Sequence, residues 1–402
     1  MPTRRWLLKG AVGALVSASS AGVARSTPAD LPQGTLDSAV LYALPGKRPL
    51  LKRSYRPPNF ETPPSAFAQV LTPNDQFFVR WHLASIPEVD ADHWRLSVGG
   101  PGASNAYELS LAELKADFEP VDIVAVCQCA GNRRGYSDPH VPGVQWGSGA
   151  VGNARWKGVR LKDLLARVGI AKDAVEVAYQ GGDRPALDAT PAYVKSLPVW
   201  KAQDDATLIA YEMNGAPLPH WNGSPARLIV PGWVATYWVK QIARIEVLTS
   251  PLQGFWMKTA YRIPKGRFPI DDRFPTQSND TNTPITEMVV NSMITSPEPG
   301  ARLRRGATTT LRGIAWDAGY GIRRVDVSID HGQTWSTARL GADLGRYSFR
   351  SWEYDLKPPA PGKLTVMARA TNAEGATQAD VLIYNPAGYH NNVVEPVIYS
   401  VS

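Results

Sequence analysis

The chain has 402 residues, of which 44% are apolar and 20% are charged. This length and composition exclude an intrinsically disordered protein and allow two or possibly three domains with buried cores. Residues 1–25 hold four of the 43 basic residues and none of the 36 acidic ones, so their removal would reduce the net charge from +7 to +3. No basic run with interleaved aromatic residues occurs, and we expect no nucleic-acid partner.

The first 25 residues have the layout of a cleavable export signal. Arg4, Arg5 and Lys9 precede an apolar stretch at residues 10–16, and small residues follow as far as Ala24. The apolar stretch is too short to span a membrane, so we expect no membrane span in the mature protein. The paired arginines are typical of a twin-arginine signal, which is read by a pathway that exports folded proteins. We therefore expect a periplasmic protein that receives a cofactor before export.

Residues 26–282 are predicted to form a mixed α+β domain after an N-terminal arm, residues 26 to about 75, with little regular structure. The compact region is expected to begin at residues 77–83, and residues 123–126 read as a buried strand. Ser110 and Glu113 form a capping box that predicts a short helix. A second helix is predicted by the apolar spacing of residues 161–168, with its end at Gly169.

A second domain, a β-sandwich of immunoglobulin-like size, is predicted for residues 283–402. A polar stretch at residues 271–286 precedes it and marks the expected boundary. Beyond that stretch the apolar residues alternate with a period of two, as in Val325, Val327 and Ile329. Such alternation, repeated between turns over about 120 residues, is typical of short strands in a sandwich.

The two cysteines of the chain, Cys127 and Cys129, lie in the sequence Cys-Gln-Cys-Ala-Gly-Asn-Arg-Arg-Gly. Two cysteines at this separation do not suit a disulfide framework. A thiolate is a soft ligand for a transition metal, and nearby arginines favour the ligating form of a thiol. Residues i and i+2 of a strand share a face, so on spacing alone either cysteine could be the ligand.

The segment from Cys129 to Arg134, with Phe-Phe-Val-Arg-Trp-His-Leu at residues 77–83, resembles the molybdenum domain of the sulfite oxidase family. Further blocks follow in the same order at residues 154–159, 210–215, 225–227 and 230–232. The resemblance spans roughly residues 70–385. It implies a mononuclear molybdenum centre with molybdopterin, in which Cys129 is the protein ligand to the metal and Cys127 is structural.

The resemblance also assigns the other site residues. It implies that the side chains around a small oxyanion substrate are those of Arg80, Arg134, Trp146 and Tyr261. It implies that those contacting the pterin and its phosphate are His82, His220, Arg227 and Lys240. Arginine suits sulfite because its planar fork offers paired hydrogen bonds to an oxyanion. The loop at His220 departs from the family pattern in length and composition.

Residues 323–335 resemble the dimerisation domain of the same family, so a homodimer or a heterodimer is expected. In relatives this domain can lend an arginine to the substrate pocket, and Arg346 and Arg350 are the nearby candidates. The resemblance predicts oxidation of sulfite to sulfate. Because the chain has no Cys-X-X-Cys-His motif, the electrons are expected to pass to a separate or tightly bound c-type cytochrome.

Three other functions remain open. A sulfane dehydrogenase component of sulfur oxidation is related to the same family. An exported methionine sulfoxide reductase has the same catalytic core, although it normally lacks the second domain. The third alternative, from a different class, is a non-catalytic exported binding module that uses the sandwich for adhesion. The combination of Cys129, Arg80 and Arg134 argues against that last alternative.

Overall fold

The computed structural model describes residues 41–268 and 272–402. The predicted signal, residues 1–25, lies outside the described residues. Most regular elements are strands and the helices are few and short, so the predicted α+β class holds only coarsely. Within the described ranges, no helix has the length and apolar composition needed to cross a membrane.

A small antiparallel sheet lies at the N-terminal side of the described chain, with strand order β1-β2-β3-β4. Its strands are β1 (Leu41–Tyr42), β2 (Leu50–Ser54), β3 (Asn59–Glu61) and β4 (Val79–Arg80), and the short 3-10 helix η1 (Pro64–Ala68) follows β3. The prediction of an irregular arm up to residue 75 was therefore wrong for residues 41–75. Leu50, Phe60 and Trp81 bury one another in a separate core beneath this sheet, and that burial outweighs the polar, proline-rich composition of the segment.

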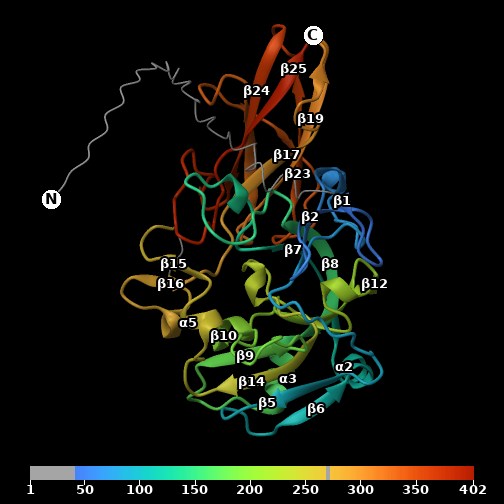
Figure 1. The fold of residues 1–402 in the computed structure, drawn as a ribbon, viewed down its shortest axis with the longest axis vertical. Helices are drawn as coiled ribbons and strands as arrows, with labels where there is room; N and C mark the ends of the chain where they lie inside the picture. Colours follow the sequence, from blue (N-terminus) through green and yellow to red (C-terminus); the bar gives the residue numbers. More distant parts are fainter. Residues whose placement is uncertain (1–40, 269–271) are drawn as a thin grey trace, which may run out of the picture.

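Two larger sheets form the body of the first domain (Figure 1). One has the order β12-β11-β8-β7, with β13 paired to β11, and consists of β7 (Pro120–Gln128), β8 (Val151–Arg160), β11 (Leu208–Met213), β12 (Ala216–Pro217) and β13 (Arg227–Ile229). The other has the order β10-β9-β14-β5-β6 and consists of β5 (Arg95–Gly99), β6 (Tyr107–Ser110), β9 (Glu176–Gly181), β10 (Val194–Pro198) and β14 (Ile242–Leu248). The predicted strand at residues 123–126 is confirmed inside β7, where residues 124–128 are buried.

Short helices connect these strands. Both predicted helices are confirmed: α2 (Leu111–Asp117) begins with the Ser110 capping box, and α3 (Leu161–Val168) ends at Gly169, whose φ is +72°. The remaining short elements of this domain are α4 (Val199–Ala202), α5 (Phe255–Lys258), η2 (Arg134–Tyr136), η3 (His220–Asn222), η4 (Ala235–Tyr237), η5 (Pro275–Gln277) and the ribbon of β15 (Arg262–Pro264) with β16 (Asn282–Pro284).

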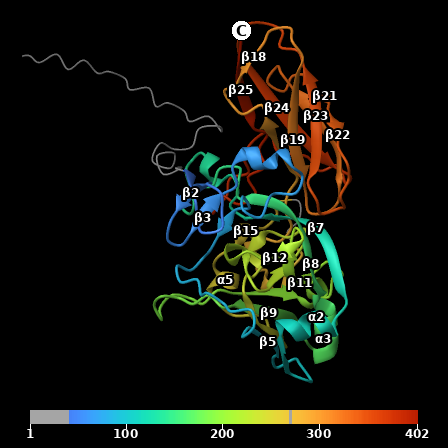
Figure 2. The ribbon, with the colours of Figure 1, turned by 90° about the vertical axis from the view of Figure 1, so that its right-hand side faces the viewer.

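The C-terminal part of the chain forms two sheets that share one apolar core (Figure 2). The first sheet, β17-β19-β23-β22, contains β17 (Asn291–Ser296), β19 (Thr309–Trp316), β22 (Arg339–Leu340) and β23 (Arg350–Leu356). The second, β18-β25-β24-β20-β21, contains β18 (Arg302–Leu303), β20 (Ile322–Ser328), β21 (Ser336–Thr337), β24 (Gly362–Asn372) and β25 (Pro396–Val401). The predicted period-two strands are confirmed in β20 and β24. The immunoglobulin-like topology and the boundary at residues 282/283 stay predictions.

The two parts of the chain are in close contact. Trp316 at the end of β19 is buried in the main core of the first domain, and its Nε1 donates to Gln128 Oε1 at 2.5 Å. Between β24 and β25 the chain returns to the first domain, where the segment 385–391 lies against the loop that follows β7 (Figure 1). This segment brings residues of the second domain to the site described next.

Candidate active site

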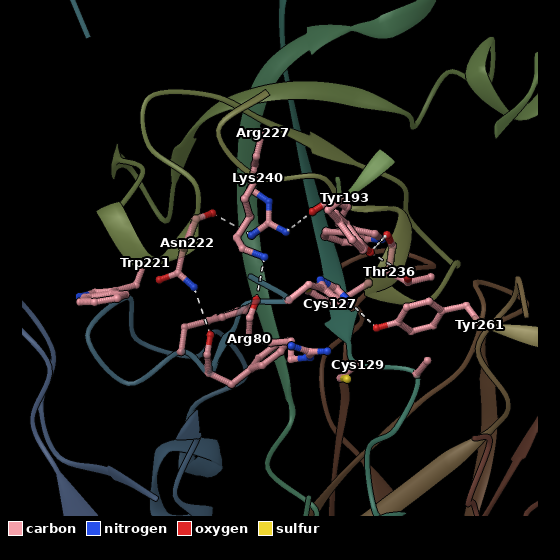
Figure 3. A pocket seen from close by; sticks show the side chains of 16 residues that line it. Arg80, Cys127, Cys129, Tyr193, Trp221, Asn222, Arg227, Thr236, Lys240 and Tyr261 are labelled. Carbon is pink, nitrogen blue, oxygen red and sulfur yellow. Dashed lines mark hydrogen bonds between the residues drawn. The ribbon is translucent and has the colours of Figure 1, made fainter. Parts of the chain in front are cut away.

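The ends of several strands converge on one pocket (Figure 3). β4 supplies Arg80, the end of β7 supplies the two cysteines, and β13 supplies Arg227. The pocket is lined by Phe77, Phe78, Arg80, His82, Cys127, Cys129, Ala130, Tyr193, Trp221, Asn222, Arg227, Ala235, Thr236, Trp238, Lys240 and Tyr261. Six of the predicted site residues, together with Cys127, are thus in one place.

Both cysteines are buried free thiols that face the pocket but have different neighbours. Burial raises the pKa of Cys127 to about 11, and the adjacent Arg227 guanidinium opposes that rise only in part. Cys129 follows the last residue of β7 and is close enough to Arg80 and Tyr261 to influence the pKa of each. The pocket therefore has one end with Cys129, Arg80 and Tyr261, and another with Cys127, Arg227 and Lys240.

Two buried cations form the second end. The Arg227 guanidinium donates from Nη1 to the Asn222 carbonyl oxygen at 2.9 Å and from Nη2 to the Trp238 carbonyl oxygen at 3.0 Å. Its buried Nε has no hydrogen-bond partner within the part of the chain that the structure describes. Lys240 Nζ donates to the Arg80 carbonyl oxygen at 2.8 Å. Burial lowers the pKa of Lys240 to about 7, and the nearby Arg227 lowers it as well. The Asp183 carboxylate opposes this lowering of the Lys240 pKa, but no carboxylate of the described chain is among the groups that influence the pKa of Arg227. A buried charge without a counter-charge is costly, so this end of the pocket suits an anionic ligand.

Arg80 lies at the end of the pocket that contains Cys129, and its carbonyl oxygen accepts the hydrogen bond from Lys240. Its Nη1 donates to Asn59 Oδ1 at 3.3 Å and also to the Trp81 carbonyl oxygen. Burial by itself would lower the pKa of Arg80, but the neighbouring Tyr261 and Cys129 raise it above its ordinary value. The guanidinium therefore stays charged near neutral pH.

His82 and Tyr261 are paired through His82 Nε2 and the Tyr261 hydroxyl. Burial lowers the pKa of His82 well below its ordinary value, and the charge of Arg80 lowers it further. Burial also raises the pKa of Tyr261, with Arg80 opposing the rise. Near neutral pH the imidazole is thus uncharged and the phenol keeps its proton, so the pair can hold one proton between two oriented atoms.

The backbone at Tyr261 is strained. Its φ of +60° lies in the left-handed region, which a bulky residue seldom adopts. Such a conformation costs about 1–3 kcal/mol and persists only where the surrounding structure holds it. The Tyr261 carbonyl oxygen accepts a hydrogen bond from Ile285 N at 2.9 Å. Strain of this kind is concentrated at functional sites, which agrees with a functional position for the Tyr261 hydroxyl.

Three predicted site residues do not line the pocket. Arg134 is buried in η2 and donates to the carbonyl oxygens of Ala387, at 2.7 Å, and Val144, at 3.1 Å. Trp146 is fully buried in the main core, and none of the described residues is a hydrogen-bond partner of its Nε1. His220 faces a separate surface cavity, whereas Trp221 and Asn222, the next two residues, reach the pocket.

Several residues of the pocket wall were not among the predicted site residues. Tyr193 stacks on the His82 ring with centroids 3.8 Å apart, and its hydroxyl donates to the Thr236 carbonyl oxygen at 2.6 Å. Asn222 accepts a hydrogen bond from Lys47 Nζ at 2.5 Å through its Oδ1. Asn222 lies in the loop that departs from the family pattern, and nothing in the local sequence marks Tyr193.

Comparisons with known proteins agree with this geometry. A family model described as an oxidoreductase molybdopterin binding domain matches residues 82–256, and one described as a Mo-co oxidoreductase dimerisation domain matches residues 282–397. Human mitochondrial sulfite oxidase is 36% identical over 387 residues, which cover 91% of this chain and 68% of the human protein. Sulfite oxidase from Gallus gallus is 37% identical over 353 residues, covering 84% of this chain and 74% of that protein.

The chain belongs to the sulfite oxidase family. The fold agrees, since the crystal structure of the sulfane dehydrogenase SoxCD from Paracoccus pantotrophus matches with a TM-score of 0.74 and 25% sequence identity. That match covers 98% of this chain and 96% of the other. The cofactor that these matches imply is molybdenum carried by molybdopterin.

The pocket fits the cofactor of the sulfite oxidase family. A buried cysteine thiol at one end offers the soft donor that the metal prefers. At the other end, the Arg227 Nε has no partner among residues 41–268 and 272–402, and the Lys240 ammonium lies next to another cation, so both gain from a phosphate or a pterin acceptor. Cys129, Arg227 and Lys240 are therefore the residues that would hold the group.

Proposed function

We propose that this chain oxidises sulfite to sulfate at a molybdenum centre held in the pocket. The observation that carries the proposal is the convergence of a buried thiol, a permanently charged guanidinium and a histidine–tyrosine pair at one end of the pocket. These are Cys129, Arg80 and the pair of His82 with Tyr261. When bound, molybdenum with molybdopterin supplies the two-electron redox chemistry that the side chains lack.

The chain's own groups would bind and orient the substrate. The Arg80 guanidinium would hold two oxygens of the anion, because a fixed planar fork matches an oxyanion better than a mobile ammonium does. The Tyr261 hydroxyl can donate to a third oxygen or to a water, and the neutral His82 can accept or return that proton at Nε2. The Tyr193 ring stacks on His82 and the Tyr389 ring stacks on Tyr261, so the two members of the pair are held in place by aromatic contacts.

Three further features belong to the same proposal. A c-type cytochrome, as a separate or tightly bound subunit, would accept the electrons. The C-terminal sheets would mediate a homodimer or a heterodimer, in keeping with the dimerisation-domain match. A twin-arginine signal at residues 1–25 would export the folded, cofactor-loaded protein to the periplasm.

Oxidation of a sulfane sulfur is the second candidate function. It is favoured by the likeness, along almost the whole chain, to the solved structure of the sulfane dehydrogenase SoxCD from Paracoccus pantotrophus. Both substrates place an oxidisable sulfur near a metal, but a carrier-bound sulfane sulfur needs a wider approach than free sulfite does.

The test is steady-state kinetics of the loaded protein with sulfite, and in parallel with a cysteine persulfide on a small protein, using ferricyanide and cytochrome c as acceptors. The proposal predicts saturable sulfite oxidation with both acceptors and a much lower kcat/KM for the persulfide. Turnover of the persulfide alone would refute sulfite oxidation and support the sulfane alternative. Absence of both activities in protein that contains molybdenum would refute both.

A further inference from the structure

The second domain places an aromatic ring directly on Tyr261. Tyr389, in the segment between β24 and β25, lies 128 residues further along the chain. The two rings are nevertheless stacked, with centroids 5.6 Å apart and an interplanar angle of 9°. Tyr389 is 7% exposed, so most of its surface is used in this contact and in contacts with the loop after β7.

Tyr261 needs such a contact. Its left-handed backbone is held on the carbonyl side by the hydrogen bond from Ile285. The hydroxyl end of the ring is fixed by His82 Nε2. Stacking by Tyr389 constrains the face of the Tyr261 ring, which neither hydrogen bond does. An offset, nearly parallel arrangement is a favoured geometry for two aromatic rings.

Tyr389 is itself firmly held. Asn385 braces its backbone on both sides, because Tyr389 N donates to Asn385 Oδ1 at 3.0 Å and Asn385 Nδ2 donates to the Tyr389 carbonyl oxygen at 2.8 Å. The Arg134 guanidinium lies 5.4 Å from the centroid of the Tyr389 ring and donates to the Ala387 carbonyl oxygen at 2.7 Å. A Cβ added to Gly388 would come within 2.8 Å of Arg134 Cγ, so the segment is packed tightly against that arginine.

We propose that Tyr389 is a positioning residue that the second domain supplies to the active site: its ring holds the strained Tyr261 so that the Tyr261 hydroxyl meets His82 and the substrate. The effect of Tyr389 on turnover rests on the proposed function, whereas its effect on the order of Tyr261 does not.

The experiment compares three variants of the full-length, loaded protein. Tyr389→Leu removes the aromatic ring but keeps an apolar side chain of similar bulk, and Tyr389→Phe keeps the ring. Tyr399→Leu is the matched control, because Tyr399 is also a buried tyrosine of the second domain but lies in β25, where its hydroxyl donates to the Pro297 carbonyl oxygen at 2.8 Å. The readouts are amide hydrogen exchange in residues 259–263 and at Ile285, sulfite kcat and KM, and molybdenum content.

We expect Tyr389→Leu to speed exchange in residues 259–263 and to lower kcat by about tenfold, since small misplacements of a group that contacts substrate have effects of this size. KM and molybdenum content should change little. Tyr389→Phe keeps the ring but loses the interaction of the Tyr389 hydroxyl with the Tyr261 backbone, so its losses should be clearly smaller than those of Tyr389→Leu. Tyr399→Leu should lower the Tm without changing exchange in that segment or kcat.

Three outcomes would overturn the proposal. Exchange in residues 259–263 unchanged by Tyr389→Leu would show that the ring does not hold Tyr261. Equal losses in Tyr389→Phe and Tyr389→Leu would assign the effect to the hydroxyl rather than to stacking. An equal increase of exchange in residues 259–263 in Tyr399→Leu and Tyr389→Leu would show that general destabilisation, and not loss of stacking, causes the effect. A wild-type protein that does not oxidise sulfite would instead refute the proposed function, and the exchange comparison would still decide the role of Tyr389.

Discussion

Arg80 combines a fixed charge with a restricted position. It is held by Asn59 and by the Trp81 carbonyl oxygen, and the Lys240 ammonium donates to its own carbonyl oxygen. These contacts orient the guanidinium toward the end of the pocket that contains Cys129 (Figure 3). Since Arg80 has no carboxylate within ion-pairing distance among the described residues, its charge is available to an anionic substrate.

We predict that Arg80→Met lowers kcat/KM for sulfite by about ten- to hundredfold, mainly through KM. A hydrogen bond to a charged group contributes about 1.5–3 kcal/mol, which corresponds to one to two decades. Molybdenum content and Tm should change little. The exposed Arg302 in β18, changed to Met, is the control for loss of a positive charge. An unchanged kcat/KM in Arg80→Met would remove Arg80 from the substrate site.

The approach to Arg80 from solvent is positively charged. A cavity of about 490 Å³ is lined by Arg53, Arg56, Arg80 and His82, among other residues, and no carboxylate is part of its described wall. Glu61 compensates Arg53 through an ion pair of 2.9 Å, while Arg56 is exposed at the rim. Like charges that line a cleft raise the local concentration of an oppositely charged substrate.

We therefore predict that kcat/KM for sulfite falls as ionic strength rises, with kcat unaffected. Arg56→Gln should lower kcat/KM by roughly two- to fivefold at low salt and make the salt dependence less steep, because screening acts on exposed charges. Stopped-flow or steady-state kinetics between low and physiological salt measure both effects. Equal salt dependence in wild type and Arg56→Gln would contradict the prediction.

At the scale of elements, the sequence was informative where a local rule decides the structure. The Ser110 capping box predicted the start of α2, and Gly169 predicted the end of α3. The sequence did not predict strands β1 to β3. These strands are short, and they are stabilised by burial of Leu50 and Phe60 against Val79 and Trp81. Local composition does not reveal such long-range burial.

The candidate site likewise contains residues that local sequence signals predict and residues that only long-range contacts bring together. Residues next to strand ends in recognisable blocks, such as Arg80, Cys129 and Lys240, converge as expected. Tyr193 and Tyr389 could not be predicted, because their contacts with His82 and Tyr261 join segments more than 100 residues apart. His220 was expected in the pocket but faces a neighbouring cavity, at the loop where the resemblance was weakest.

The segment that carries Tyr389 should make stability depend on pH through His390. Burial lowers the pKa of His390 from 6.5 to about 3, and its Nδ1 has no partner among the described residues. The folded state therefore binds fewer protons than the unfolded state between these values, so the stabilising contribution is complete above pH 6.5 and is lost as the pH falls toward 3.

We predict that the Tm of the wild type decreases more steeply between pH 6.5 and pH 4 than that of His390→Asn. Asparagine is chosen because His390 has a φ of +56°, which asparagine tolerates. Thermal unfolding followed by circular dichroism at several pH values gives the two slopes. Parallel slopes would show that His390 does not titrate on unfolding.

On the scale of the whole molecule, the second domain is part of the catalytic structure. Buried Arg133 donates to Asn291 Oδ1 at 3.1 Å and to Glu395 Oε2 at 3.4 Å, and both partners belong to the C-terminal part of the chain. Trp316 and Phe349 are buried in the main core of the first domain. Removal of the second domain would expose this apolar surface and leave a buried charge without its partners.

We predict that a protein truncated after residue 282 aggregates or loses its folded structure, and that it does not oxidise sulfite. The controls are full-length protein expressed in the same way and size-exclusion chromatography of both. A soluble fragment with full activity and the same oligomeric state as the intact protein would refute this dependence.

The most direct test of a molybdenum-dependent sulfite oxidation at Cys129 is a single turnover without any external electron acceptor. Protein exported by a molybdenum-replete host is mixed with excess sulfite, and sulfate is measured against the molybdenum content. The account predicts about one sulfate per molybdenum in the wild type and in Cys127→Ser, and none in Cys129→Ser, because a hydroxyl is a poor replacement for the soft thiolate ligand. Wild-type protein that contains molybdenum but forms no sulfate, or full sulfate formation by Cys129→Ser, would contradict it.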